Sequence, residues 1–313
     1  MKLFACCAII LVLSVSVYST SAVSDTYSAP AFDETLAMRL LRFAAMVTCD
    51  KGQLATWTCE GCKNLPGVTV LTSIFDDIQD NFAYVALDAN SPYGPSIIVS
   101  VRGTTGWKNW VEDVEAWHDK VNFKNLTNVR VHAGWMKGFT NMRDQVQAGV
   151  AKGLNMSPNA RIMTTGHSMG GAFAELLAVD LATTEHIGQT LSQSLDTPIT
   201  VYHNITVYNY GTPRVGDANW ASLAHQCIFS YYRLTHAQDI VPRMPPTIIP
   251  FSYRHPPTEV WLPDAAGKQI KICSATNGED PNCINGSGPY SFSDHVQYLG
   301  HDIGHCACPP VDN

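Results

Sequence analysis

The pentapeptide Gly166-His167-Ser168-Met169-Gly170 constrains the fold more than any other part of the sequence. It follows a run at 160–165 that is typical of a buried strand and precedes an Ala- and Leu-rich run at 168–183 that is typical of a helix. Glycines two residues to either side of the serine avoid collisions in a tight strand-to-helix turn. We therefore expect Ser168 to be presented as a nucleophile, the Met169 amide to bind an oxyanion, and His167 to be structural.

Strand and helix patterns alternate along most of the chain. Periodicity predicts helices at 32–47, 138–153 and 168–183, and strands at 69–75, 82–87, 96–101, 160–165, 205–210 and 230–235. This alternation indicates the α/β class: a mostly parallel central sheet flanked by helices, with its reactive groups at the carboxyl ends of the strands. The length and the lack of a linker suit one domain.

The first 22 residues are typical of a secretory signal peptide. Lys2 precedes an apolar run that is shorter than the roughly 20 residues of a spanning helix, and small residues follow, Thr20 and Ala22 among them. We expect cleavage near Val23 and a single domain at 23–313. The expected location is extracellular, or the lumen of the secretory or endolysosomal pathway. An uncleaved N-terminal anchor is the alternative.

The charge balance bears on partners. The chain carries 20 basic and 27 acidic residues, a formal net charge of −7. An acidic surface argues against a nucleic-acid partner and gives no attraction to anionic lipid, so any lipid contact must be apolar. Four Asn-x-Ser/Thr sequons, at Asn125, Asn155, Asn204 and Asn285, add weak support for export.

Cysteine usage also suits an exported protein. Eight cysteines lie beyond the predicted signal peptide: Cys49, Cys59, Cys62, Cys227, Cys273, Cys283, Cys306 and Cys308. An even number in an oxidising compartment predicts disulfides. Two alternatives are a redox pair at Cys59-x-x-Cys62 and a metal site in the segment His301-x-x-x-His305-Cys306-x-Cys308.

An activated serine needs a base and an acid. Where the serine lies on such a strand-to-helix turn, the acid follows the serine in the sequence and the histidine follows the acid. Asp239 stands four residues past the predicted strand at 230–235. Asp217 is the runner-up, and we expect it to cap or turn its loop. The base is one of four later histidines, and spacing alone does not choose among them: His255, His295, His301 and His305. His295 is favoured because it begins an apolar stretch after a polar loop.

Six motifs in this order resemble the fungal-type (class 3) lipases of the α/β-hydrolase superfamily. They are Val101-Arg-Gly-Thr104, Asn109-Trp-Val-Glu-Asp113, Val131-His-Ala-Gly134, Gly166-His-Ser-Met-Gly-Gly171, Tyr210-Gly-Thr-Pro-Arg-Val-Gly-Asp217 and Asp239-Ile-Val-Pro-Arg243. The resemblance implies an α/β-hydrolase fold with Ser168, Asp239 and His295 as the catalytic triad. It also implies that Thr104 joins Met169 in the oxyanion hole.

The segment after Thr104 resembles the helical lid of that family. Its apolar residues share one helical face: Trp107, Trp110, Val111, Val114 and Trp117. Exposing such a face to water is unfavourable, so we expect the helix to cover the site in water and to open at a lipid surface. An ordinary surface helix packed on the core is the alternative.

The resemblance further implies three disulfides, Cys49–Cys306, Cys59–Cys62 and Cys273–Cys283. Cys227 and Cys308 depart from the family pattern. We expect them to form a fourth bridge by elimination, or Cys306 and Cys308 to exchange roles.

These expectations together describe a secreted carboxylic-ester hydrolase, foremost a triacylglycerol lipase that forms an acyl-enzyme at lipid interfaces. A phospholipase A1 and a feruloyl-type soluble esterase are alternatives within the enzyme class, and an inactive lipid-binding protein is the alternative outside it. Side chains and water suffice for the chemistry, so we expect no metal or organic cofactor. The expected partners are an acylglycerol or other lipid ester and, transiently, a lipid–water interface, with no nucleic acid and no stable partner.

Overall fold

The computed structural model describes residues 30–78, 80–103, 118–184, 205–304 and 306. Its strands are β1 (Val68–Asp76), β2 (Asn81–Asp88), β3 (Ser96–Arg102), β4 (Lys120–Asn122), β5 (Arg130–His132), β6 (Arg161–His167), β7 (Ile205–Tyr210), β8 (Ser230–His236), β9 (Glu259–Leu262), β10 (Lys271–Ile272), β11 (Gln297–Tyr298) and β12 (His301–Asp302). Its α-helices are α1 (Glu34–Met46), α2 (Lys51–Ala55), α4 (Ala133–Met156), α5 (Met169–Ala182) and α7 (Ala218–Cys227). Short 3-10 helices are η1 (Gly61–Asn64), η3 (Val241–Arg243), η4 (Ile284–Gly286) and η5 (Ser293–Val296).

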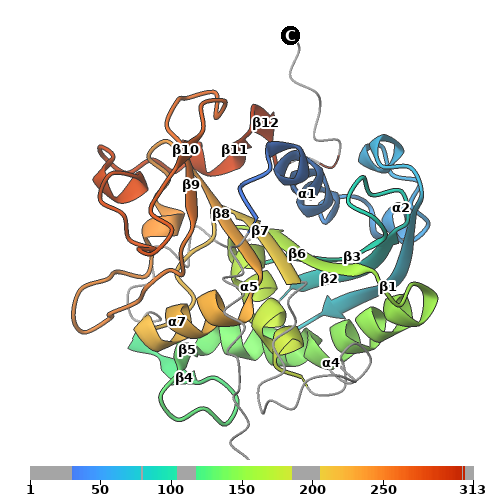
Figure 1. Cartoon of the computed structure of the whole chain (residues 1–313), viewed down its shortest axis with the longest axis horizontal. Helices are drawn as coiled ribbons and strands as arrows, with labels where there is room; N and C mark the ends of the chain where they lie inside the picture. The colour runs from blue at the N-terminus through green and yellow to red at the C-terminus, as the bar shows by residue number, and fades with distance from the viewer. Residues whose placement is uncertain (1–29, 79, 104–117, 185–204, 305, 307–313) are drawn as a thin grey trace, which may run out of the picture.

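The central sheet has eight strands in the order β1-β2-β3-β6-β7-β8-β9-β10. The five strands from β3 to β9 run parallel, while β1, β2 and β10 pair antiparallel at the two edges. Parallel pairing brings the carboxyl ends of β3, β6, β7 and β8 to one edge of the sheet (Figure 1). The loops that follow these four strands therefore meet there.

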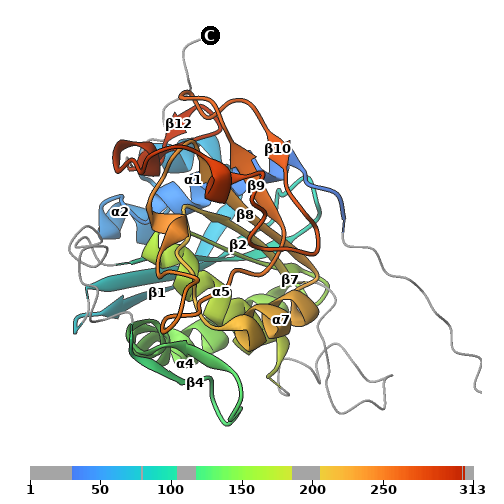
Figure 2. The ribbon, with the colours of Figure 1, turned by 90° about the vertical axis from the view of Figure 1, so that its left-hand side faces the viewer.

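Helices cover both faces of the sheet. Figures 1 and 2 show α1 and α2 on one face and α4, α5 and α7 on the other. Alternate side chains of each strand supply the two cores: in β2, Tyr84 packs with α1, whereas Ala83 and Val85 pack with α4 and α5. Helix α5 is buried along its whole length, as expected for a helix enclosed between the sheet and its neighbours.

The predicted elements are confirmed, with differences at their ends. Helix α4 begins at Ala133, five residues before the predicted start, because the His132 ring caps it by accepting from Gly134 N and Trp135 N. Asp217 caps α7 by accepting a 2.9 Å hydrogen bond from Trp220 N, as its expected capping role requires. Periodicity missed β9 and β10, which are too short to carry a clear pattern.

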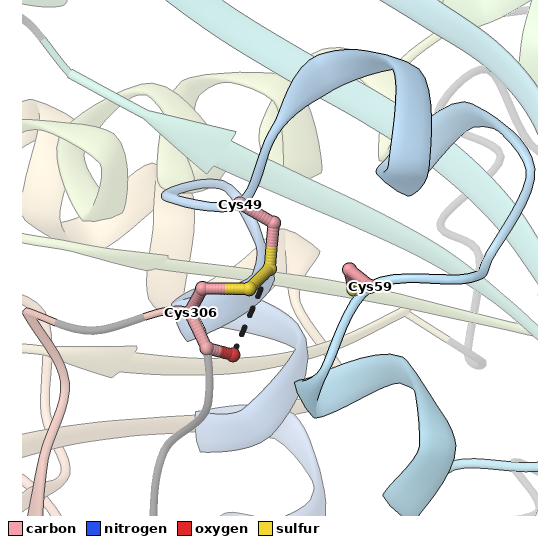
Figure 3. Close-up of side chains that lie close together, drawn as sticks. All are labelled: Cys49, Cys59 and Cys306. Atoms are coloured by element: carbon pink, nitrogen blue, oxygen red, sulfur yellow. Dashed lines mark hydrogen bonds between the residues drawn. A yellow bond between two sulfur atoms is a disulfide. The ribbon is translucent and has the colours of Figure 1, made fainter.

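The described residues contain three disulfides: Cys49–Cys306, Cys59–Cys62 and Cys273–Cys283. Figure 3 shows Cys49, Cys59 and Cys306 close together, at metal-binding distances, yet all three thiols are used in bridges. The Cys59–Cys62 bridge is buried, whereas a redox pair needs an accessible sulfur. These contacts favour a structural role over the redox and metal alternatives.

The predicted fourth bridge is wrong. Cys227 is a free, buried thiol. It packs in the core on the face of the sheet that α5 and α7 cover. Cys49 and Cys306 pack on the opposite face, so the sheet separates Cys227 from the segment around Cys306. Cys306 also keeps its place opposite Cys49 and does not exchange with Cys308, which lies outside the described residues.

Among the residues that the structure describes, no helix has both the length and the apolar character to cross a membrane.

Candidate active site

Ser168 lies in a sharp turn between β6 and α5. Its backbone has φ 56° and ψ −130°, a conformation that costs a non-glycine residue on the order of 1–3 kcal/mol. Its N–H donates to the carbonyl of Tyr210 on β7, which helps to hold the turn. A methyl group on Gly166 would lie 2.4 Å from Gly170, and one on Gly170 would lie 2.1 Å from the Val101 carbonyl. Both glycines are therefore required, as the motif predicts.

The first turn of α5 faces the end of β3. A Cβ added to Gly103 would lie 2.3 Å from the Met169 Cβ and 3.0 Å from the Gly170 nitrogen, so the loop after β3 touches the helix N-terminus. Partial positive charge gathers at such a terminus. This contact places Gly103 next to the first residues of α5, Met169 and Gly170. The predicted partner Thr104 and the predicted lid residues lie outside the described residues: Trp107, Trp110, Val111, Val114 and Trp117.

Asp239 and His295 form a fully buried pair. His295 Nδ1 lies 2.8 Å from Asp239 Oδ2, and both side chains have no exposed surface. The carboxylate accepts two further hydrogen bonds, from the Tyr298 hydroxyl at 3.0 Å and from Val241 N at 2.9 Å. Burial, then the adjacent Asp239 charge, raises the pKa of Tyr298 well above its ordinary value, so Tyr298 keeps its proton. The structure thus brings Asp239 and His295 into contact, whereas the sequence only favoured each of them over other candidates.

His167 links the serine turn to His295. The two rings are tilted by 35° with centroids 4.5 Å apart, and His167 Nε2 lies 2.7 Å from the His295 carbonyl oxygen. A carbonyl only accepts, so His167 donates from Nε2. Burial and then the charge of His295 hold the pKa of His167 well below its ordinary value. His167 is therefore a neutral support for His295, consistent with the structural role expected for it.

The loops that carry Asp239 and His295 are bonded to each other. Ser291 N donates to the Gln238 carbonyl at 2.9 Å, and Ile240 N donates to the Ser291 carbonyl at 3.2 Å. Gln238 N donates to Asp294 Oδ2 at 3.0 Å. These bonds fix the two loops in register, so the Asp239–His295 pair rests on backbone contacts as well as on its own hydrogen bond.

A cavity of about 260 Å³ opens beside the serine. One wall comes from the end of α1 and the residues after it, Ala44, Val47 and Thr48. The other wall comes from the segment after His295, which includes Val296 and Ile303. The Ser168 side chain lies at the cavity and has no hydrogen-bond partner within the described part of the chain. An apolar pocket next to a serine suits the hydrocarbon part of a substrate.

The other candidate histidines lie elsewhere. His255 is buried and donates from Nε2 to the Pro242 carbonyl at 2.7 Å, and burial lowers its pKa well below the ordinary value. His301 lies in β12, and His305 is outside the described residues. Sequence reasoning missed Tyr298, the third donor to Asp239. Only its position three residues after His295 hinted at it.

The sequence model of the family described as Lipase (class 3) matches residues 98–248, a segment that contains the serine turn and Asp239. A lipase of Rhizomucor miehei is 29% identical over 253 residues, which is 80% of this chain and 64% of that protein. Over that segment the chain is similar to the class 3 lipase family.

Other relatives agree. A secreted mono- and diacylglycerol lipase of Fusarium solani is 28% identical over 69% of this chain and 59% of its own length. Like the Rhizomucor match, this one leaves more than a third of the relative's length unmatched: the chain spans 59–64% of the first curated relatives. The structure of the Rhizomucor miehei lipase–propeptide complex superposes with a TM-score of 0.74 at 27% identity, over 89% of this chain and 84% of that one. The α/β-hydrolase fold with a mostly parallel sheet is confirmed.

Proposed function

We propose that this chain hydrolyses carboxylic esters of acylglycerols, with Ser168 as nucleophile, His295 as base and Asp239 as the acid that orients the base. The observation that carries the proposal is the hydrogen bond from His295 to the buried Asp239 beside a serine on a strained turn. With Nδ1–H donated to Asp239, the neutral His295 ring has its lone pair on Nε2, where it can accept the serine proton.

The proposed reaction has two halves. Ser168 Oγ attacks the acyl carbon while His295 takes its proton, and the Met169 amide, with Thr104, stabilises the negative oxygen. Collapse expels the alcohol, which takes the proton from His295, and leaves an acyl-enzyme. Water then attacks the acyl carbon and gives a proton to His295; on collapse His295 returns that proton to the departing Ser168 Oγ, which releases the fatty acid and restores the free serine.

The substrate class is proposed from the family and the surroundings of the site. Relatives include proteins named lipase and secreted mono- and diacylglycerol lipase. Apolar residues line the cavity next to Ser168. We further propose that the protein is secreted as one domain spanning 23–313 after removal of residues 1–22, and that the segment from Trp107 to Trp117 supplies a lid.

The test is hydrolysis by the purified protein and by Ser168→Ala. We expect at least a thousandfold loss of activity in the variant, with an unchanged unfolding temperature. Activity near wild type in Ser168→Ala would contradict the assignment. Triacylglycerol emulsions, monoacyl- and diacylglycerols, phospholipid vesicles and short soluble esters should be compared in parallel. Preference for phospholipid would favour a phospholipase A1, and preference for soluble aromatic esters would favour a feruloyl-type esterase.

A further inference from the structure

His236, the last residue of β8, is buried with both ring nitrogens facing backbone carbonyl groups. Nδ1 lies 2.8 Å from the Asp294 carbonyl oxygen, and Nε2 lies 2.9 Å from the Asp264 carbonyl oxygen. The side chain is 1% exposed, so water has little access to either nitrogen. A carbonyl oxygen accepts hydrogen bonds and cannot donate them.

This geometry restricts the protonation state of the ring. Neutral imidazole has one N–H and one bare nitrogen, and the bare nitrogen would turn its lone pair toward a carbonyl oxygen. Only the imidazolium form donates from both nitrogens. The two contacts therefore indicate a positively charged ring.

Charged and titratable groups lie on the elements packed around the ring. Carboxylates come from each packed element: Asp239 from the turn after β8, Asp264 from the turn after β9, and Asp294 from η5. The other titratable neighbours are Tyr298, whose ring meets that of His236 edge-on at 6.2 Å, His295, and the exposed Lys268.

The contacts of His236 lead directly to the candidate base. Asp294 immediately precedes His295. Moreover, the His236 carbonyl accepts from Asp239 N at 2.9 Å, so the same residue also holds the turn that carries the acid. His236 thus touches the backbone on both sides of the Asp239–His295 hydrogen bond.

We propose that His236 is a positioning residue, an imidazolium that fixes the carbonyls of Asp294 and Asp264 and thereby holds His295 in line with Asp239. The proposal rests on the proposed function only for its effect on rate. The charge state and the clamp can be tested without substrate.

The first measurement is NMR of the histidine ring nitrogens in the ¹⁵N-labelled full chain at pH 7. His236→Gln identifies the His236 signals by their loss. We expect both nitrogens of His236 to carry protons at pH 7. A spectrum with one protonated and one bare nitrogen would overturn the proposal.

The second measurement is the kinetics of a soluble ester. We expect His236→Gln to lower kcat by about tenfold to a hundredfold, because misplaced catalytic groups lose rate, with KM changed less than about twofold. His225→Gln, an exposed histidine of α7, is the matched control and should behave as wild type.

A His236→Gln variant with the kcat and KM of His225→Gln would overturn the positioning role. Thermal unfolding of both variants separates loss of fold from loss of positioning. If Ser168→Ala stayed active, the proposed function would fail, yet the NMR measurement would still test the charge state of His236.

Discussion

The hydroxyl of Tyr298 donates a 3.0 Å hydrogen bond to the carboxylate of Asp239. The accepting oxygen, Oδ2, is the one that also accepts from His295. A hydrogen bond to a charged group contributes about 1.5–3 kcal/mol, and here it helps to fix the oxygen that accepts from His295. We predict that Tyr298→Phe lowers kcat on a soluble ester by about tenfold while KM stays within about twofold. Tyr290→Phe, an exposed tyrosine, is the control, and equal rates in the two variants would contradict the prediction.

Gly103 tests the proposed oxyanion site without touching the triad. Any side chain at this position would meet the Met169 Cβ at 2.3 Å and push the loop after β3 away from α5. We predict that Gly103→Ala lowers kcat by about a hundredfold, the effect of losing one oxyanion donor. Gly52→Ala, in the exposed α2, should leave kcat unchanged. Steady-state kinetics of the two variants checks this, and full activity in Gly103→Ala would exclude a close oxyanion loop.

Glu175 makes folding sensitive to pH. It is fully buried in α5 and accepts from Trp220 Nε1 and Tyr231 Oη, each at 2.6 Å. Burial raises its pKa from 4.5 to about 7, so the folded state binds the proton more tightly than the unfolded chain does. This contribution is fully present below about pH 4.5 and is lost as pH rises through about 7.

We therefore predict that the titration of Glu175 lowers the free energy of unfolding by about 3 kcal/mol as the pH rises from about 4.5 to above 7. Glu175→Gln can accept from Trp220 and donate to Tyr231, and it should remove most of that decrease. Urea unfolding at pH 5 and pH 8 measures the difference. A pH dependence as steep as that of the wild type would contradict the assignment.

Cys49–Cys306 closes a loop with a sequence separation of 257, whereas Cys273–Cys283 spans only 10. Loop-entropy arguments give upper limits of about 6 and about 3 kcal/mol for the two bridges. We predict that the double serine variant of Cys49 and Cys306 unfolds at a clearly lower temperature than the double serine variant of Cys273 and Cys283. Calorimetry under non-reducing conditions ranks them, and the reverse order would show that the loop-length argument fails here.

Two neighbouring isoleucines follow the loop of Asp239 and are strongly exposed: Ile248 by 67% and Ile249 by 88%. Transferring such side chains from water to lipid is favourable by about 2 kcal/mol each. We predict that replacing both by serine lowers the rate on triacylglycerol emulsions several-fold and leaves soluble-ester kinetics unchanged. Met156→Ser is the control. Met156 is also exposed, but it lies at the end of α4, before the start of β6, whereas Ser168 follows the end of that strand. An equal loss on both substrates would exclude a role in contact with lipid.

The parts of the fold with strong periodicity were predictable. The strand at 205–210 and the helix around Ser168 carry apolar runs that leave little choice of structure. Asp239 was predictable because it follows a strand end. The base was not, since its selection depends on the contact between η5 and the turn after β8, two segments 56 residues apart with no regular pattern. Tyr298 and His236 were missed for the same reason: their roles arise from what they face after folding.

The Cys227 error has a related cause. A count of cysteines predicts a bridge between the two that remain unassigned, Cys227 and Cys308. Pairing, however, requires that two thiols lie close together, on one face of the sheet. The sequence alone did not show on which face of the sheet α7 and the segment around Cys306 pack.

The pairing of Asp239 with His295, and of Cys49 with Cys306, has a consequence for biosynthesis. A growing chain that ends before residue 291 can form most of the sheet and the serine turn, yet it has neither the base nor the last bridge. Its Ser168 has no group to take its proton. The proposed hydrolase therefore stays inert on the ribosome until residues 291–306 have been made, because only then are the base and its supporting bridge in place.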